Sequence, residues 1–274
     1  MHHRFLLLLT ALCAGAPHAF AQSPAITWQI LENKYFTVHF TAPDTAFIPV
    51  LVETLEQGAA TNAAFFDRPF PQRFDVWCFP DRALLDRQWQ QDWGDSTFQS
   101  ACWMVASGVS KRLDLLSPRM WETQACEHRS PFAAPDSAAS AKRLREFKLL
   151  LTHELTHVYH GQHCRIPDFT GMDALGWWVE GLATYVSGQL DSARIERVRT
   201  LVRDAKAPAG LDQFWSGPNR YGLSGSVVAA VDARYGRAML SRLLPLTTPA
   251  EVFEALGADE TAVLANWNRW FENR

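Results

Sequence analysis

The pattern of hydrophobic and polar residues changes about halfway along the chain. Segments 26–30 and 35–40 alternate apolar and polar side chains, which is typical of strands with one buried face. Apolar residues then recur at helical spacing, so we expect a helix over 47–66. The mainly apolar segment 73–79 predicts a buried strand, and 80–93 predicts a short helix after it.

Two more strands are expected before the middle of the chain. Segments 100–108 and 111–118 have strand-like patterns, and a hairpin around Ser107 and Gly108 would join them. The following segment, 129–141, is rich in Pro, Ala and Ser, which indicates an exposed loop. From Lys142 onward the pattern is helical almost to the end.

A strand-rich half followed by a helical half is typical of an α+β architecture. We expect an N-terminal mixed β-sheet with helices over 22–128 and a helical part over 141–274. The seam between them would lie near the 129–141 loop or just after the central helix. A chain of this length is enough for one large domain or two small ones, and we expect one domain, 22–274.

The first residues have the pattern of a signal peptide. Arg4 precedes an apolar run, and Ala19-Phe20-Ala21 supplies the small residues of a cleavage site. We therefore expect residues 1–21 to be removed after Ala21 and the protein to be exported, to the periplasm or outside the cell. The alternative is an uncleaved anchor, but the apolar run is shorter than the ~20 residues that a spanning helix needs.

Composition excludes several classes of partner. The formal net charge is −3, so nothing indicates binding to nucleic acid or to an anionic membrane surface. Beyond the N-terminal run, no segment is long and apolar enough for stable membrane insertion. The sequence indicates no particular oligomeric state.

Four cysteines follow the predicted cleavage site: Cys78, Cys102, Cys126 and Cys164. An even number in an exported protein predicts two disulfides, for which three pairings exist. Cys126 and Cys164 bracket the segment discussed next, so we expect a link between them that would hold its loops. No CxxC spacing occurs, which argues against a cysteine-ligated zinc.

The strongest chemical signal is the stretch LTHELTHVYHGQH, residues 151–163, which contains an H-E-x-x-H motif. His153 and His157 are four residues apart, so on a helix both imidazoles project from one face and can reach one ion. Zn²⁺ binds nitrogen ligands readily, and a catalytic site uses three protein ligands. We expect one Zn²⁺ per chain, with Glu154 taking a proton from the attacking water.

Two residues compete for the third ligand position. His163 follows His157 by six residues, the metzincin spacing, but the glycine of that pattern comes one place late, at Gly161. Glu180 lies in GWWVEGLATYVSG, where neighbouring aromatic and apolar residues would hold it inward on a second helix. A glutamate buried among tryptophans is costly without a cation, and a metal would supply one.

HELTH followed by WWVEGLATYV resembles the gluzincin peptidases, thermolysin-like zincins in which two histidines and a later glutamate bind zinc. The W-x-x-E-G-x-A-x-Y pattern is similar to that of zinc aminopeptidases and of small peptidase MA-like domains. The resemblance implies a zincin-like fold, His153, His157 and Glu180 as ligands, and Glu154 as general base. It also implies that Tyr221, in RYGLSGSVVAAVDARYG, stabilises the oxyanion.

The resemblance predicts an exported zinc metallopeptidase that acts on peptides or proteins. The aminopeptidases carry a G-x-M-E-N segment upstream of the motif, and none occurs here, so we expect an endopeptidase. By analogy with zincins, the predicted strand 111–116 would be the sheet edge along which a peptide docks. Two alternatives stay open: a catalytically silent zincin-fold scaffold of the cell envelope, and a metzincin-like peptidase that uses His163.

Overall fold

The computed structural model describes residues 26–132 and 138–272. The predicted signal peptide and part of the predicted 129–141 loop lie outside the described residues. None of the helices that the structure describes has the length and hydropathy needed to cross a lipid bilayer.

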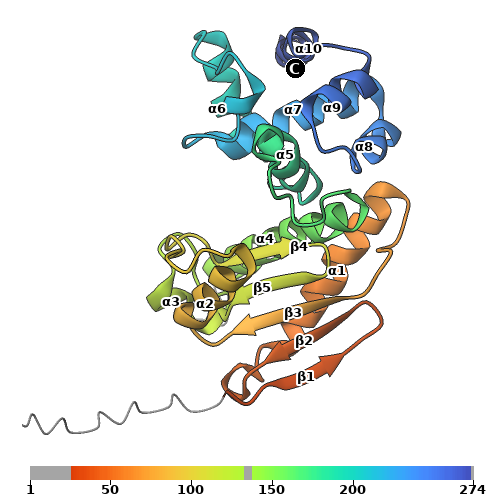
Figure 1. Ribbon diagram of the computed structural model, residues 1–274. Coiled ribbons are helices and arrows are strands. Elements are labelled where there is room, and N and C mark those ends of the chain that lie inside the picture. Colours follow the sequence, from red (N-terminus) through yellow and green to blue (C-terminus); the bar gives the residue numbers. More distant parts are fainter. Residues whose placement is uncertain (1–25, 133–137, 273–274) are drawn as a thin grey trace, which may run out of the picture.

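A five-stranded mixed sheet forms the N-terminal part, as the sequence predicted (Figure 1). The strand order is β1-β2-β3-β5-β4, with parallel pairing in the middle and antiparallel pairing at both edges. The strands are β1 (Gln29–Glu32), β2 (Phe36–Phe40), β3 (Phe74–Phe79), β4 (Ala106–Val109) and β5 (Arg112–Leu116). Alternation in β2 buries Phe36, Val38 and Phe40 completely or nearly so, which explains its register in the sheet.

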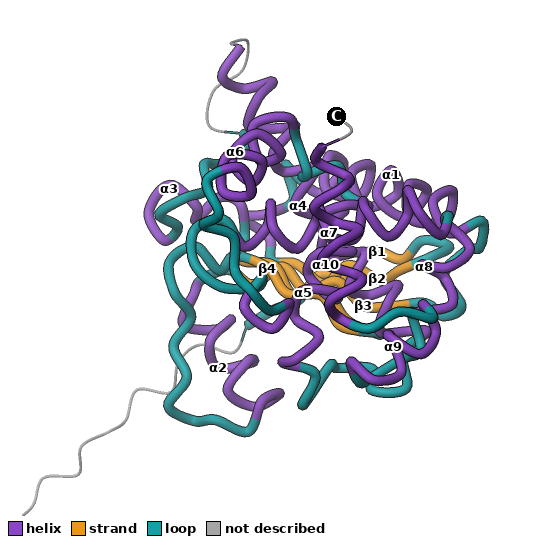
Figure 2. Tube along the Cα trace, turned by 90° about the horizontal axis from the view of Figure 1, so that it is seen from above, coloured by secondary structure: helices purple, strands orange, loops and turns teal. Residues whose placement is uncertain are grey.

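Ten α-helices complete the described part of the chain, and they dominate its C-terminal half. They are α1 (Ile48–Phe66), α2 (Arg82–Trp93), α3 (Trp121–Gln124), α4 (Ala138–His163), α5 (Gly176–Val186), α6 (Ser192–Arg203), α7 (Arg220–Tyr235), α8 (Arg237–Leu243), α9 (Pro249–Leu256) and α10 (Glu260–Glu272). Figure 2 shows α1 and α4 on one face of the sheet and α2 on the opposite face.

The apolar core consists of two clusters that meet along α4. One is built from the sheet, α1, α2 and α4, and includes Leu151, Leu155 and Val158. The other is built mainly from α5 to α10, and Tyr159 of α4 belongs to it. The helix that carries the H-E-x-x-H motif is therefore held from both sides, which fixes its position in the molecule.

The predicted hairpin is present, but its turn and its place in the sheet differ from the prediction. The turn lies at Ser110 and Lys111, and the first strand begins only at Ala106. Arg82 explains the late start, because its guanidinium binds the backbone carbonyls of Ala101, Cys102 and Met104. The prediction that 111–116 is an edge was wrong: β5 lies inside the sheet, and the edge strands are β1 and β4.

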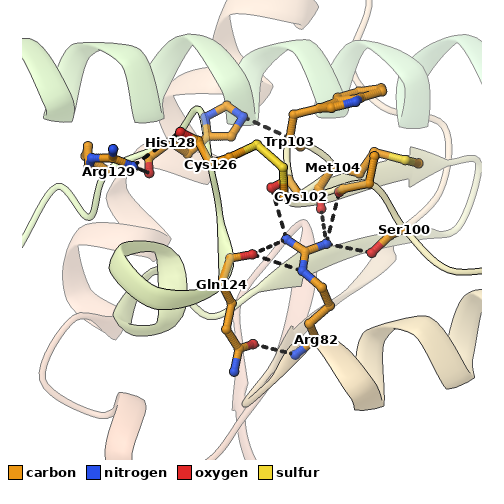
Figure 3. The surroundings of a disulfide bond; sticks show 10 residues. Arg82, Ser100, Cys102, Trp103, Met104, Gln124, Cys126, His128 and Arg129 are labelled. Carbon is orange, nitrogen blue, oxygen red and sulfur yellow. Dashed lines mark hydrogen bonds between the residues drawn. A yellow bond between two sulfur atoms is a disulfide. The ribbon is translucent and has the colours of Figure 1, made fainter.

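The predicted disulfides are also corrected. The structure joins Cys102 to Cys126 and leaves Cys78 and Cys164 as buried free thiols, so the Cys126–Cys164 link is wrong (Figure 3). Cys78 lies in the central strand β3, inside the sheet-side core, where no other cysteine of the described chain reaches it. Cys164 follows α4 directly and packs its sulfur against the thioether of Met172 at 3.8 Å.

Candidate metal centre

The two histidines of the motif lie in the fully buried part of α4. His153 is 4% exposed and His157 7%, and their rings are stacked edge to face with centroids 4.8 Å apart. Leu151 and Leu155, at the same spacing, are fully buried in the sheet-side core. Residues 151–161 are all buried, so this part of α4 is enclosed on every side and both imidazoles lie inside the protein.

Glu180 completes a three-residue group. Its Oε2 atom lies 3.3 Å from Nε2 of His153 and 3.5 Å from Nε2 of His157. The two Nε2 atoms are themselves 3.1 Å apart. All three donor atoms lie within 4.8 Å of one another, so this group could hold a metal ion. Two imidazole nitrogens and one carboxylate oxygen are a donor set that suits a divalent transition metal.

Helix α5 brings Glu180 to the histidines because α5 packs very closely on α7. A Cβ atom added at Gly181 would lie 2.5 Å from the backbone oxygen of Ser224, so only glycine permits this approach. Trp177, Trp178 and Leu182 are almost fully buried on the other sides of α5. The helix is thus locked in place with its glutamate directed at α4.

Opposite charges at the centre reinforce each other. Burial alone would raise the pKa of Glu180, but the His157 and His153 imidazoles outweigh it and hold the pKa well below its usual range. Burial alone would lower the pKa of His157, but the Glu180 carboxylate reverses this and raises it above 6.5. A cation, either a proton or a metal ion, is therefore favoured between these groups.

Glu154 lies beside the histidines but outside the three-residue group. It is 7% exposed, and burial raises the pKa of its carboxyl above the usual value. Edge strand β4 covers its backbone: a Cβ atom at Gly108 would lie 2.2 Å from the Glu154 carbonyl oxygen. A buried carboxylate with a raised pKa is suited to accept and return a proton at neutral pH.

Tyr221 lies at the start of α7, with its ring close to that of His153. The centroids of the two rings are 6.1 Å apart, and Trp215 packs edge-on against Tyr221 at 4.9 Å. Burial raises the pKa of its hydroxyl, so the phenol stays protonated and can donate a hydrogen bond. The structure therefore brings all five residues of the predicted site to one place.

The other two histidines of the stretch have different surroundings. His163, at the end of α4, packs against the Tyr159 ring, and its Nδ1 donates to the Tyr159 carbonyl oxygen at 2.9 Å. His160 is fully buried against Phe169, and burial lowers its pKa to about 3. Neither belongs to the three-residue group found among the described residues, so the geometry favours Glu180 over His163.

Sequence reasoning missed the glycines that position the site. Gly108 allows β4 to lie against α4 at Glu154, and Gly181 allows α5 to lie against α7 at Ser224. Gly181 could have been suspected because it directly follows Glu180 inside a helix, where glycine is unfavourable without a packing reason. Nothing in the pattern around Gly108 indicates that α4 lies against it.

No protein-family model matches this chain, and no curated protein sequence does. The likeness to gluzincins therefore depends on the H-E-x-x-H and E-G-x-A motifs and on the geometry described above.

Proposed function

We propose that this protein is a zinc metallopeptidase of the gluzincin type. The observation that carries the proposal is the convergence of Glu180, from a separate helix, on the paired histidines of α4. His153, His157 and Glu180 would hold one Zn²⁺, and three is the number of protein ligands that catalytic zinc sites have. When bound, Zn²⁺ would supply Lewis acidity toward a carbonyl oxygen.

The remaining residues would do the proton chemistry of peptide hydrolysis. Glu154 is buried one residue along from His153, and its raised pKa suits it to take a proton from the attacking water. The same carboxyl then gives that proton to the leaving amine. Tyr221, neutral and close to His153, would donate a hydrogen bond to the oxygen that becomes negative.

Edge strand β4 is the proposed docking strand for an extended peptide. The strand order leaves one side of β4 unpaired within the sheet, and α4 lies directly against Gly108 of that strand. A peptide added there would run past the centre with its backbone hydrogen-bonded to the strand. This placement replaces strand 111–116, which lies inside the sheet.

Export to the periplasm or outside the cell is part of the proposal. It depends on the N-terminal pattern of residues 1–21, and the Cys102–Cys126 disulfide supports it, because such bonds persist in oxidising compartments.

Replacement of Glu154 tests the proposed reaction. With zinc-loaded protein and a quenched fluorescent peptide library, we expect Glu154→Gln to lower the turnover rate about 10²- to 10⁴-fold, because the amide cannot accept the proton. Zinc content should be unchanged, since Glu154 is not among the three ligands. The matched control is Glu146→Gln, an exposed glutamate of α4 that pairs with Lys142.

Two results would contradict the proposed activity. Equal turnover in Glu154→Gln and wild type would show that another group performs the proton transfer. Wild-type protein that binds zinc but cleaves no peptide of the library would favour the scaffold alternative.

A further inference from the structure

An arginine-rich pocket lies beside Tyr221, next to the proposed metal centre. It has a volume of about 340 Å³. Its walls include Arg194 and Arg197 of α6, Arg220 and Tyr221 of α7, and Glu127 from the loop after α3. Tyr221 belongs to both the pocket and the centre, so a molecule bound at one lies within reach of the other.

The two helices present these arginines together because they pack closely. Arg194 and Arg197 are three residues apart and lie on one face of α6. A Cβ atom at Gly222 would lie 2.8 Å from Cγ2 of Val198 and 3.3 Å from the Arg194 carbonyl oxygen, so glycine permits the contact with α7. The Arg194 guanidinium consequently lies 5.9 Å from the centre of the Tyr221 ring.

Arg220 is held by aromatic rings rather than by an acidic partner. Its guanidinium carbon lies 4.7 Å from the ring centroid of Trp103, and 5.3 Å from each of the centroids of Trp215 and Tyr221. Its Nε atom is buried and makes no hydrogen bond to any residue that the structure describes. A buried N–H donor without an acceptor is costly unless an anion arrives to pair with it.

The charges of the pocket are strongly unbalanced. Among the described residues, neither Arg197 nor Arg220 has an ion pair within 4.0 Å, whereas Arg194 lies 3.4 Å from Asp191. Exposed Glu127 is the acidic residue of the lining. The backbone N–H groups in the first turn of α7 add positive potential on the same side. The pocket therefore attracts an anion.

The disulfide between Cys102 and Cys126 connects the segment that carries Trp103 to the loop that carries Glu127 (Figure 3). The Trp103 carbonyl also lies 3.2 Å from Nε2 of His128. These links hold the Trp103 ring where it can stack on Arg220, so the pocket is built before any ligand binds.

We propose that this pocket binds a carboxylate of the peptide substrate, which makes the enzyme selective for peptides with an acidic group close to the scissile bond. The inference depends on the proposed function. Guanidinium groups bind carboxylates through paired N–H donors, and here they come from two helices. The carboxylate would come either from an Asp or Glu side chain or from the C-terminus of the peptide.

Paired substrates and an arginine variant test the proposal. Cleavage by zinc-loaded protein is compared for Glu- and Gln-containing peptides, and for peptides with a free or an amidated C-terminus. We expect kcat/KM to be roughly 10- to 100-fold higher for the carboxylate member of one pair. Arg194→Gln with Arg197→Gln should remove that preference. The matched control is Arg199→Gln, an α6 arginine outside the pocket that pairs with Glu196.

The pair that shows the preference identifies the source of the carboxylate. A preference for Glu over Gln indicates side-chain recognition, and a preference for the free C-terminus indicates recognition of the peptide end. Equal rates within both pairs would overturn the proposal while leaving the peptidase function intact. A preference that survives the double arginine variant would overturn it as well.

A binding arm separates failure of the pocket from failure of catalysis. Fluorescently labelled forms of the same peptides are titrated with zinc-loaded Glu154→Gln protein, and anisotropy reports binding without turnover. Tighter binding of the carboxylate peptide, lost with the two arginine replacements, supports the pocket even if the wild type cleaves nothing. Equal binding of acid and amide peptides would contradict it.

Discussion

His157 and Glu180 each favour the charged form of the other. The carboxylate raises the pKa of the imidazole, and the imidazoles lower the pKa of the carboxylate. The spacing of the motif predicted that His153 and His157 share one face, because helical geometry alone determines it. Their distance to Glu180 could not be predicted in the same way, since it depends on how α5 packs against α4.

Zinc affinity should fall at mildly acidic pH. Zinc must displace a proton from His157 below the pKa of that residue, which lies above 6.5 in the metal-free protein. Affinity is then level at higher pH and decreases by about tenfold per pH unit below the pKa. Chelator competition between about pH 5.5 and pH 8 measures this.

Glu180→Gln provides the comparison for the pH effect. The substitution removes the Glu180 carboxylate, which is the main group that raises the pKa of His157. The effect of burial, which lowers that pKa, is then less opposed. Weaker binding is expected throughout, with a decline that starts at lower pH than in wild type. An identical onset in both proteins would show that Glu180 does not control His157.

At the scale of helices and strands, the contact between α5 and α7 positions Glu180, the proposed third ligand. Gly181→Ala places a methyl group 2.5 Å from the Ser224 carbonyl oxygen, so α5 must move and carry Glu180 with it. We expect a loss of ~1–3 kcal/mol in the free energy of unfolding, together with weaker zinc binding. Denaturant titration and zinc competition measure the two effects.

Gly176→Ala is the matched control on the same helix. There the nearest atoms are in the Trp215 side chain, at 3.2 Å, so a shift of a few tenths of an ångström relieves the contact. Equal losses in the two variants would contradict a special role for the Gly181 contact.

The bounds of helices and strands were predicted well where one face of the element is buried. They were predicted poorly where a side chain from elsewhere hydrogen-bonds the backbone. The helix expected at 47–66 is α1, and the segments 35–40 and 73–79 are β2 and β3 with similar bounds. Residues 100–105 have a strand-like pattern. The Arg82 guanidinium, however, donates hydrogen bonds to carbonyl oxygens of this segment, so they are not available to a neighbouring strand. No local pattern reveals a guanidinium that comes from another helix.

Across the whole molecule, strand order and disulfide pairing were the least predictable features. Both depend on which distant segments meet, and the pattern of one segment does not contain that information. The α+β class was predictable because it needs only the type of each element. Helix α4 shares in both apolar clusters, so the site lies where the sheet part joins the helical part.

Removing the disulfide should weaken the whole fold. We expect Cys102→Ser with Cys126→Ser to lower the free energy of unfolding by ~2–4 kcal/mol, because the crosslink restricts the unfolded chain. Denaturant titration measures the loss, and because both cysteines are exposed, their replacement removes no core packing. A double variant as stable as wild type would contradict this expectation.

The zinc content of the purified protein tests the central claim most directly. Elemental analysis should find one zinc per chain in wild type, in agreement with the three-residue group. Glu180→Ala and His157→Ala should lose it, while His163→Ala should keep it, because His163 bonds to the Tyr159 carbonyl instead. Wild type without zinc, or zinc lost in His163→Ala but kept in Glu180→Ala, would contradict the account.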